Sequence, residues 1–424
     1  MRLFYERLAG WTSISDTFIS FFANQPGCFW LDREHHSDER FSVIGAGSLA
    51  TELKPTSFED ELDLPFRFRP GFVGVVKYPK EAASVEAVEG LLVDRAFVYD
   101  HDARAMYFVG LFETIEQFQS WFHAALLRLA LLGGDAAGYQ LNNPAATAAV
   151  LEPKSSKLKY LNAIARCQEH ISKGDVYQIC LTTKIEGDYS GDPLSYFLRL
   201  RRENPAPYTT FLRIGAVTYV SISPERFITV HGKRVLSSPI KGTRPRSKDS
   251  KRDQQLIEEL GTDAKERAEN LMIVDLIRND LSIACEPASI RVESLLAVKS
   301  YSTLHQLVSD VSGELRKGLS GKEALLALLP GGSMTGAPKI RAMEILQQLE
   351  FGDRDAYSGG IGWIDGHWNM DLGMVIRTAA FRENRVSIGI GGGITSDSKP
   401  ENEHDEIVLK SKALVDALGA SVSW

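Results

Sequence analysis

Two pairs of glutamates in this 424-residue chain have a spacing that suits metal binding. Glu266 and Glu269 are three residues apart in a stretch with a helical pattern, and Glu403 and Glu406 repeat the arrangement near the end of the chain. Residues three apart project from one face of a helix, where like charges repel, and Lys410 is predicted on the second face. Either face alone is typical of a solvated helix surface. Two such faces opposite each other would offer oxygen ligands suited to Mg²⁺.

A single lysine, Lys241, lies between Pro239 and Gly242 in the stretch SSPIKGTRPR (237–246). Pro, Gly and Thr favour a fixed backbone, whereas lysine usually occupies a flexible, solvated position. A lysine that the backbone holds in place could serve as a nucleophile, and Arg244 and Arg246 add positive charge nearby. The alternative interpretation is an ordinary surface lysine.

Three further features could bind anions or line a site. Arg377, in the apolar stretch VIRTA, is expected to pair with an internal acid or a ligand carboxylate, because burying an unpaired charge is costly. The glycine stretches 330–339 and 389–395 could present backbone N–H groups to an anion or form tight turns. The first is no P-loop, because its lysine does not directly follow the second glycine. His305 by itself is best interpreted as a core histidine.

The elements that must position these residues indicate an α+β fold, because several strands and several helices alternate irregularly. Two helix starts carry the spacing of a capping box, Asp263 with Glu266 and Ser398 with Glu401. Residues 158–187 predict a helix that ends at Gly174 and then a strand. The sequence also predicts short strands over 208–240 and strands over 358–365 and 385–396. It predicts helices over 263–284, 320–332, 337–350 and 399–420.

Composition narrows the class of protein. A net charge of −7 and a pI near 5.8 argue against nucleic-acid binding. Four scattered cysteines without a CxxC pair predict neither a disulfide framework nor a zinc site, and they suit a reducing cytoplasm. The N-terminus lacks the apolar core of a signal peptide. The apolar run 120–134 is too short to span a bilayer and predicts a buried helix. A cytoplasmic protein without membrane contact is expected, with regions 1–135 and 158–424 joined by a polar linker at 136–157.

Nine stretches between Leu158 and Leu414 carry a combined signal that is more specific than any one of them. They are GDVYQICLT, SISPERF, PIKGTRPR, DAKERAENLMIVDLIRNDL, LHQLVSDVSGEL, LPGGSMTGAPKIRAMEIL, YSGGIGW, VIRTA and ENEHDEIVLKSKAL. Together they resemble the chorismate-utilising enzymes, and they run in that family's order. The family includes anthranilate synthase component I, aminodeoxychorismate synthase component I, and isochorismate and salicylate synthases. The resemblance implies two interleaved halves whose antiparallel sheets pack as a sandwich, with helices outside and the site between the halves; residues 1–135 resemble the family more loosely.

The resemblance also implies roles for individual residues. It places Mg²⁺ on Glu269 and Glu406, with Glu266 and Glu403 assisting through water. It makes Glu225 the acid that protonates the departing C4 hydroxyl, which at neutral pH requires a raised pKa. It makes His305 a catalytic residue that lines the ring with Ser333. The other residues that it assigns to chorismate are Tyr357 and Arg377 for the enolpyruvyl carboxylate, Lys410 and Gly391, Gly392 and Gly393 for the ring carboxylate, and Thr243 for substrate binding.

Two positions predict which reaction is catalysed. Enzymes of the family that add water at C2 carry a lysine base where this chain has Gln178, so isochorismate and salicylate synthesis are disfavoured. Anthranilate synthases resemble the second stretch but read PIAGT, whereas aminodeoxychorismate synthases read PIKGT. Lys241 is therefore expected to add to C2 of chorismate, after which ammonia enters at C4 and expels the lysine. The alternatives are anthranilate synthesis and a catalytically silent relative.

The predicted product is 4-amino-4-deoxychorismate, the precursor of 4-aminobenzoate and folate. No glutaminase stretch of the Cys-His-Glu type is found in the chain. The resemblance therefore implies that ammonia comes from a separate glutamine amidotransferase subunit.

Overall fold

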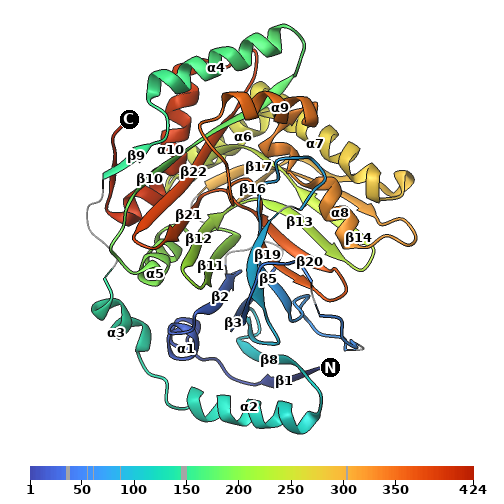
Figure 1. Cartoon of the computed structure of the whole chain (residues 1–424), viewed down its shortest axis with the longest axis vertical. Helices are drawn as coiled ribbons and strands as arrows, with labels where there is room; N and C mark the ends of the chain where they lie inside the picture. The colour runs from blue at the N-terminus through green and yellow to red at the C-terminus, as the bar shows by residue number, and fades with distance from the viewer. Residues whose placement is uncertain (35–38, 55, 61, 86, 145–149, 302–303) are drawn as a thin grey trace.

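Two large, mainly antiparallel sheets pack face to face in the centre of the molecule, and helices cover their outer faces (Figure 1). The computed structural model describes residues 1–34, 39–54, 56–60, 62–85, 87–144, 150–301 and 304–424. The predicted α+β sandwich is confirmed. Both sheets draw strands from the first 112 residues and from the region after residue 158, so the two halves of the chain are interleaved.

The first sheet has the strand order β1-β8-β7-β3-β2-β11-β12-β21-β22-β10-β9-β23, and β18 also pairs with β10. Its strands are β1 (Arg2–Leu8), β2 (Gly27–Asp32), β3 (Phe41–Ala46), β7 (Arg95–Asp100), β8 (Ala105–Phe112), β9 (Val150–Pro153), β10 (Gln178–Asp188), β11 (Tyr208–Ile214), β12 (Val217–Ser223), β18 (Gly336–Ala337), β21 (Thr378–Arg382), β22 (Arg385–Ile394) and β23 (Ser421–Val422).

The second sheet has the order β15-β17-β14-β13-β20-β19-β5-β6-β4, and β16 also pairs with β17. Its strands are β4 (Ser48–Ala50), β5 (Gly71–Val76), β6 (Val88–Leu92), β13 (Arg226–His231), β14 (Arg234–Ser238), β15 (Ile240–Pro245), β16 (Arg291–Ser300), β17 (Leu304–Glu314), β19 (Gly360–Asp365) and β20 (Met370–Met374).

The helices form the outer layers. They are α1 (Ile14–Phe22), α2 (Ile115–Leu129), α3 (Asp135–Asn142), α4 (Lys157–Ser172), α5 (Pro193–Glu203), α6 (Ser250–Thr262), α7 (Ala264–Ala284), α8 (Gly321–Leu328), α9 (Lys339–Leu349) and α10 (Pro400–Leu418), with 3₁₀ turns at Pro287–Ser289 and Gly332–Met334. The helices that carry the two glutamate pairs pack on different sheets, because α7 contacts β17 and α10 contacts β22.

The hydrophobic core has three parts that match these layers. Phe29 and Leu31 of the first sheet pack with Val73 and Trp363 of the second, in the space between the sheets. A second cluster joins the first sheet to α1, α2, α4, α5, α9 and α10, and a third joins the second sheet to α7 and α8. Strands such as β5 and β8 are apolar along their whole length because both of their faces are covered.

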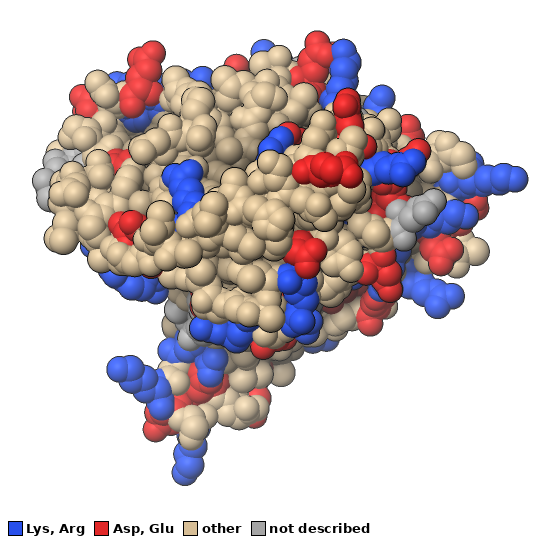
Figure 2. Space-filling model, turned by 90° about the horizontal axis from the view of Figure 1, so that it is seen from below, with Lys and Arg blue, Asp and Glu red and all other residues tan. Residues whose placement is uncertain are grey.

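The structure corrects two local predictions. The apolar run 120–134 does form most of α2, but it is not a buried helix, since Leu127 and Leu131 are 74% and 85% exposed. Figure 2 shows the end of the molecule where α2 lies, with charged side chains sparse over much of its centre. Ser398 does not cap α10; its hydroxyl instead donates a hydrogen bond to Glu403 Oε1 at 2.7 Å.

Part of the predicted linker has regular structure, because α3 and β9 lie within or across 136–157. The division into regions 1–135 and 158–424 stays a prediction. Within the described residues, none of the helices is both long enough and apolar enough to cross a bilayer.

Candidate active site

Glu225 and Ser333 form the centre of the candidate site. Glu225 lies in the short turn between β12 and β13 and is 6% exposed. The hydroxyl of Ser333, from the 3₁₀ turn that precedes β18, donates to Glu225 Oε1 at 2.7 Å. Burial raises the pKa of Glu225 to about 7, and this hydrogen bond together with the charges of Lys241, Lys410 and Arg377 opposes the rise. A carboxyl group with this pKa can hold a proton near neutral pH and release it during a reaction.

Lys241 is fixed by the strand that carries it. It lies on β15 opposite Leu307 of β17, and the pairing is irregular between Lys241 and Thr243. Gly242 makes this irregularity possible, because its φ is +79° and a Cβ there would lie 2.8 Å from Leu260 Cδ1. The side chain of Lys241 is 14% exposed, and its Nζ lies 3.9 Å from Glu269 Oε2. The predicted fixed backbone is therefore present, and the lysine is not a solvated surface residue.

Gly391, Gly392 and Gly393 form a glycine strand within β22 beside Lys241, and they have no side chains to cover the backbone on the site side. A Cβ on Gly393 would lie 2.6 Å from Gln178 Nε2 and 3.4 Å from Lys241 Nζ, and one on Gly392 would lie 3.6 Å from Glu403 Oε2. Lys410 donates to the Gly391 carbonyl at 3.1 Å. The triple glycine of β22 thus lies between Lys241, Gln178 and the helix that carries the second glutamate pair.

The two glutamate pairs meet around lysine side chains. Lys265 Nζ lies 3.7 Å from Glu269 Oε1 of its own helix α7 and 3.3 Å from Glu403 Oε1 of α10. Glu406 pairs with Lys410 at 2.7 Å and is half exposed at the rim. One ammonium group therefore bridges the carboxylates of both helices.

Electrostatics distinguishes these carboxylates. Burial raises the pKa of Glu269, and Lys241 and Lys265 oppose that rise. Burial and the charge of Glu269 also raise the pKa of Glu266. At Glu406 burial acts in the same direction, but Lys410 outweighs it and holds the pKa below its usual value. Accumulated negative charge is therefore costly at this site, and cations offset the cost.

The donor set suits a hard cation. The four glutamates of α7 and α10 offer carboxylate oxygens, which Mg²⁺ prefers. Of these atoms, Glu269 Oε1 is buried without a hydrogen-bond partner among the described residues. In the present arrangement, the described residues include no group of three or more potential ligands close enough together to hold an ion. The lysine ammonium that bridges Glu269 and Glu403 nevertheless shows that a positive charge fits between these carboxylates.

Arg377 brings a further positive charge near Glu225. It lies between β20 and β21 with φ at +47°, an unusual backbone conformation for a residue other than glycine. Its guanidinium forms no hydrogen bond or ion pair with any residue that the structure describes, while its carbonyl accepts from Ile222 N at 3.0 Å. Burial lowers the pKa of Arg377 and the charge of Glu225 opposes this effect. The group is therefore available for an anionic ligand.

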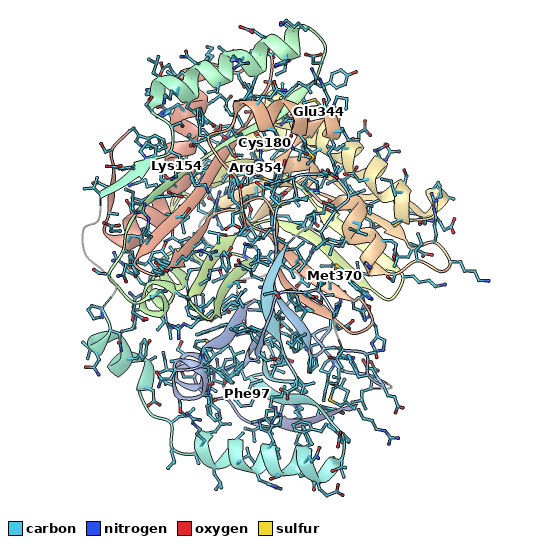
Figure 3. All side chains as sticks on the ribbon, in the orientation of Figure 1. Phe97, Lys154, Cys180, Glu344, Arg354 and Met370 are labelled. Carbon is cyan, nitrogen blue, oxygen red and sulfur yellow. The ribbon has the colours of Figure 1, made fainter. Side chains whose placement is uncertain are left out.

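Together with Arg354 and Gly389, Tyr357 lines a cavity with a volume of about 330 Å³. Its ring packs against Gly389, where a Cβ would lie 2.2 Å from the ring. Arg354 fixes the same wall, since it pairs with Glu350 at 2.6 Å and donates to the Cys180 carbonyl at 2.8 Å (Figure 3). Burial raises the pKa of Tyr357 well above its usual value, so the phenol stays neutral and can donate a hydrogen bond.

Two predicted site residues are not brought into contact with this cluster. His305 is fully buried on β17, and its imidazole contacts Ser300 Oγ at 2.7 Å and Asp253 Oδ1 at 3.0 Å. Thr243 is exposed, and none of the described contacts joins its hydroxyl to the other site residues. The catalytic role of His305 and the substrate-binding role of Thr243 stay predictions.

Sequence reasoning missed two residues that hold the site together. Lys265, which bridges Glu269 and Glu403, is four residues before Glu269, and this i,i+4 spacing could have identified it. Ser398, interpreted from the sequence as a helix cap, holds Glu403 instead. No local pattern reveals that contact.

A model of the chorismate binding enzyme family matches residues 35–416. An aminodeoxychorismate synthase of Streptomyces griseus is 39% identical over 392 residues, which cover 88% of this chain and 54% of that protein. The chain therefore spans about half the length of this relative. Aminodeoxychorismate synthase component 1 of Salmonella typhimurium is 33% identical over 382 residues, which cover 87% of this chain and 81% of that protein.

Anthranilate synthase component I from Streptococcus pneumoniae has a similar crystal structure. Its TM-score is 0.72 at 26% identity, and the match covers 84% of this chain and 82% of that one. The sandwich of interleaved sheets is thus shared with an experimentally determined structure.

Proposed function

The chain belongs to the family of chorismate binding enzymes, and we propose that it aminates chorismate at C4 to give 4-amino-4-deoxychorismate. The observation that carries this proposal is the placement of Lys241. Its amine lies on a fixed strand, 3.9 Å from Glu269 and beside the open backbone of Gly393. Lys241 also acts electrostatically on Glu225, the one buried carboxyl of the site whose pKa is raised to about 7.

Chorismate is a dianion, and the site offers cationic groups at two places. The guanidinium of Arg377 and the phenol of Tyr357 would bind the enolpyruvyl carboxylate, since the guanidinium has no other partner among the described residues. Lys410 and the backbone of Gly391–Gly393 would hold the ring carboxylate. Two anchor points fix the ring in one orientation, which places C2 and C4 relative to the reacting groups.

Lys241 and Glu225 would then act on opposite ends of the conjugated ring diene. The neutral amine of Lys241 forms a bond to C2, both ring double bonds shift by one position toward C4, and the C4 oxygen leaves as water with the proton that Glu225 donates. Ammonia next forms a bond to C4, both double bonds shift back, the C2–nitrogen bond to Lys241 breaks, and the proton lost from the added nitrogen returns to Glu225. Chorismate and ammonia thus give 4-amino-4-deoxychorismate and water, and pyruvate is retained.

Glu269 and Glu406 would hold Mg²⁺, with Glu266 and Glu403 assisting. When bound, the ion supplies positive charge beside the ring carboxylate. It would also compete with Lys265 for Glu269 and Glu403.

The choice of C4 amination over related reactions rests on two side chains. The side-chain amide of Gln178 is too weak a base to activate water, although it lies beside the space left by the missing side chain of Gly393. Lys241 offers a nucleophile where anthranilate synthases read alanine. Anthranilate synthesis remains the second candidate, because the similar crystal structure belongs to an enzyme of that name.

Ammonia would come from a separate glutamine amidotransferase subunit, and the product would serve 4-aminobenzoate and folate synthesis. A cytoplasmic location stays a prediction from the cysteine content and the N-terminal composition. The relatives named component 1 are consistent with a two-subunit enzyme.

The test is a product analysis of purified protein with chorismate, Mg²⁺ and ammonium at mildly alkaline pH. Mass spectrometry should find a product one mass unit lighter than chorismate, which an added lyase converts to 4-aminobenzoate. Anthranilate with released pyruvate would overturn the proposal in favour of the second candidate.

A further inference from the structure

A continuous set of buried polar contacts runs between the two sheets and includes Arg226, the residue after Glu225, and Ser238, three residues before Lys241. It joins segments that are far apart in sequence, because Arg33 follows β2 while the other members come from β11, β20, β13 and β14. The members, all buried, are Arg33, Tyr208, Asp371, Arg226 and Ser238. We refer to these five residues as the inter-sheet network.

Tyr208 is the central member of the inter-sheet network. Its hydroxyl donates to Asp371 Oδ1 at 2.9 Å and accepts from Arg226 Nε at 3.0 Å. The guanidinium of Arg33 lies 4.5 Å from the centre of the Tyr208 ring and 3.6 Å from Asp371 Oδ2. One hydroxyl therefore links a buried arginine to a buried carboxylate, and its loss leaves both groups without that partner.

The inter-sheet network also extends toward Lys241. Arg226 Nη1 donates to Ser238 Oγ at 3.3 Å, and the Ser238 hydroxyl donates to Asp310 Oδ1 at 2.6 Å. Asp310 pairs with Lys299 at 3.2 Å. Ser238 is the last residue of β14 and precedes Lys241 by three positions. The same contacts that hold Arg226 thus hold the segment that leads into Lys241.

Glu225 depends on this support because regular strand pairing is interrupted next to it. Arg226 pairs with Gly373 and with Ser238, and the register shifts directly after Arg226 in both pairings. The backbone of Glu225 itself accepts a hydrogen bond from Met374 N at 2.9 Å and donates one to Ser223 Oγ at 3.4 Å. The side chains of Glu225 and Arg226 contact different partners, Ser333 in the site and Tyr208 in the network.

We propose that Tyr208 and Arg226 are positioning residues for the reaction: they fix the backbone of Glu225 and of the segment before Lys241 without touching substrate. The proposal rests on the proposed role of Glu225 as the acid. Misplacement of a reacting group by about 1 Å costs on the order of 10²-fold in rate, so a small shift at Glu225 is measurable.

The test compares Tyr208→Phe with Tyr219→Phe. Tyr219 is an equally buried tyrosine of the neighbouring strand β12 whose hydroxyl donates to Glu89 Oε2 at 2.6 Å, outside the network. Both variants lose a hydrogen bond from a tyrosine hydroxyl to a carboxylate, so both should lose some stability. Only Tyr208→Phe should lower kcat, by about tenfold or more, while KM for chorismate stays near that of the wild type because Arg377, Lys410 and the glycine strand are unchanged.

A second readout does not require turnover. The carboxyl signal of Glu225 is obtained by ¹³C NMR of glutamate-labelled protein after subtraction of the Glu225→Gln spectrum, and its pKa is followed by titration. Movement of Glu225 toward solvent removes part of the burial that raises its pKa. The pKa should therefore fall in Tyr208→Phe and stay at the wild-type value in Tyr219→Phe.

The outcomes are distinct. Equal kcat values and equal Glu225 pKa values in the two variants would overturn the positioning role. If Tyr208→Phe does not fold, Ser238→Ala, which cuts the network at its other end, replaces it with the same expected results. Wild-type protein without aminating activity would refute the proposed function, and the titration would still test the positioning of Glu225.

Discussion

Replacement of Glu225 by glutamine should stabilise the protein while it removes the proposed acid. Burial raises the pKa of this carboxyl from the ordinary value of 4.5 to about 7. The shift of ~2.5 units, at about 1.36 kcal/mol per unit, means that holding the ionised group in the folded protein costs about 3 kcal/mol. The side-chain amide of the Glu225→Gln variant can still accept the hydrogen bond from Ser333, so the substitution removes the charge and keeps the shape.

The sign of the effect depends on pH. Below about pH 4.5 the carboxyl is protonated in both the folded and the unfolded state, and the cost is absent. As pH rises toward 7 the unfolded chain ionises first, so the free energy of unfolding of the wild type falls. Above about pH 7 the full cost is present. Glu225→Gln should therefore match the wild type near about pH 4 and be more stable by about 3 kcal/mol near about pH 8.

The assay is urea denaturation of both proteins over this pH range, together with turnover at each pH. Turnover of Glu225→Gln should fall by roughly 10²- to 10⁴-fold, the usual contribution of a general acid. Glu323→Gln is a control of opposite sign, because hydrogen bonds from Ser320 outweigh burial and lower the pKa of Glu323. The free energy of unfolding of this variant, relative to that of the wild type, should therefore fall as pH rises. A stability difference between Glu225→Gln and wild type that does not change with pH would refute a raised pKa at Glu225.

Three further results are expected. Lys241→Ala should lower formation of 4-amino-4-deoxychorismate by on the order of 10³-fold or more, as measured by product mass spectrometry, and wild-type product levels would exclude the nucleophile role. Glu269→Ala or Glu406→Ala should lose Mg²⁺-dependent turnover, and an unchanged Mg²⁺ titration would contradict the metal assignment. Gly242→Ala should cost about 1–3 kcal/mol in denaturation experiments, because the residue has φ at +79° and its Cβ would lie 2.8 Å from Leu260 Cδ1; an unchanged stability would show that the bulge tolerates a side chain.

The sequence predicted the elements well where local signals were strong. The helix before Gly174, the strands over 208–240 and the C-terminal helix all occur. Asp263 caps α7, with its side chain accepting from Lys265 N and Glu266 N, but the described contacts do not include the return bond from the Glu266 side chain that would complete the predicted capping box. The exposed face of α2 was not predicted, because apolar composition alone does not say whether a tertiary partner covers a helix.

The candidate site was predictable only in part. The i,i+3 glutamates and the backbone-restricted Lys241 are visible as local patterns, and the structure places them together. The partners of His305, by contrast, are Ser300 of the preceding strand β16 and Asp253 of α6, and the contact with Asp253 joins residues 52 positions apart. The inter-sheet network spans residues 33 to 371, and side-chain hydrogen bonds at such separations leave no periodicity in the sequence.

The most direct test of the account is the intact mass of the protein after incubation with chorismate and Mg²⁺ in the absence of ammonium. A covalent amine nucleophile predicts an increase equal to chorismate less water, located at Lys241 by peptide mapping, absent in Lys241→Ala, and discharged as 4-amino-4-deoxychorismate when ammonium is added. Efficient formation of that product by a protein that never acquires the mass, or acquires it at another residue, would contradict the account.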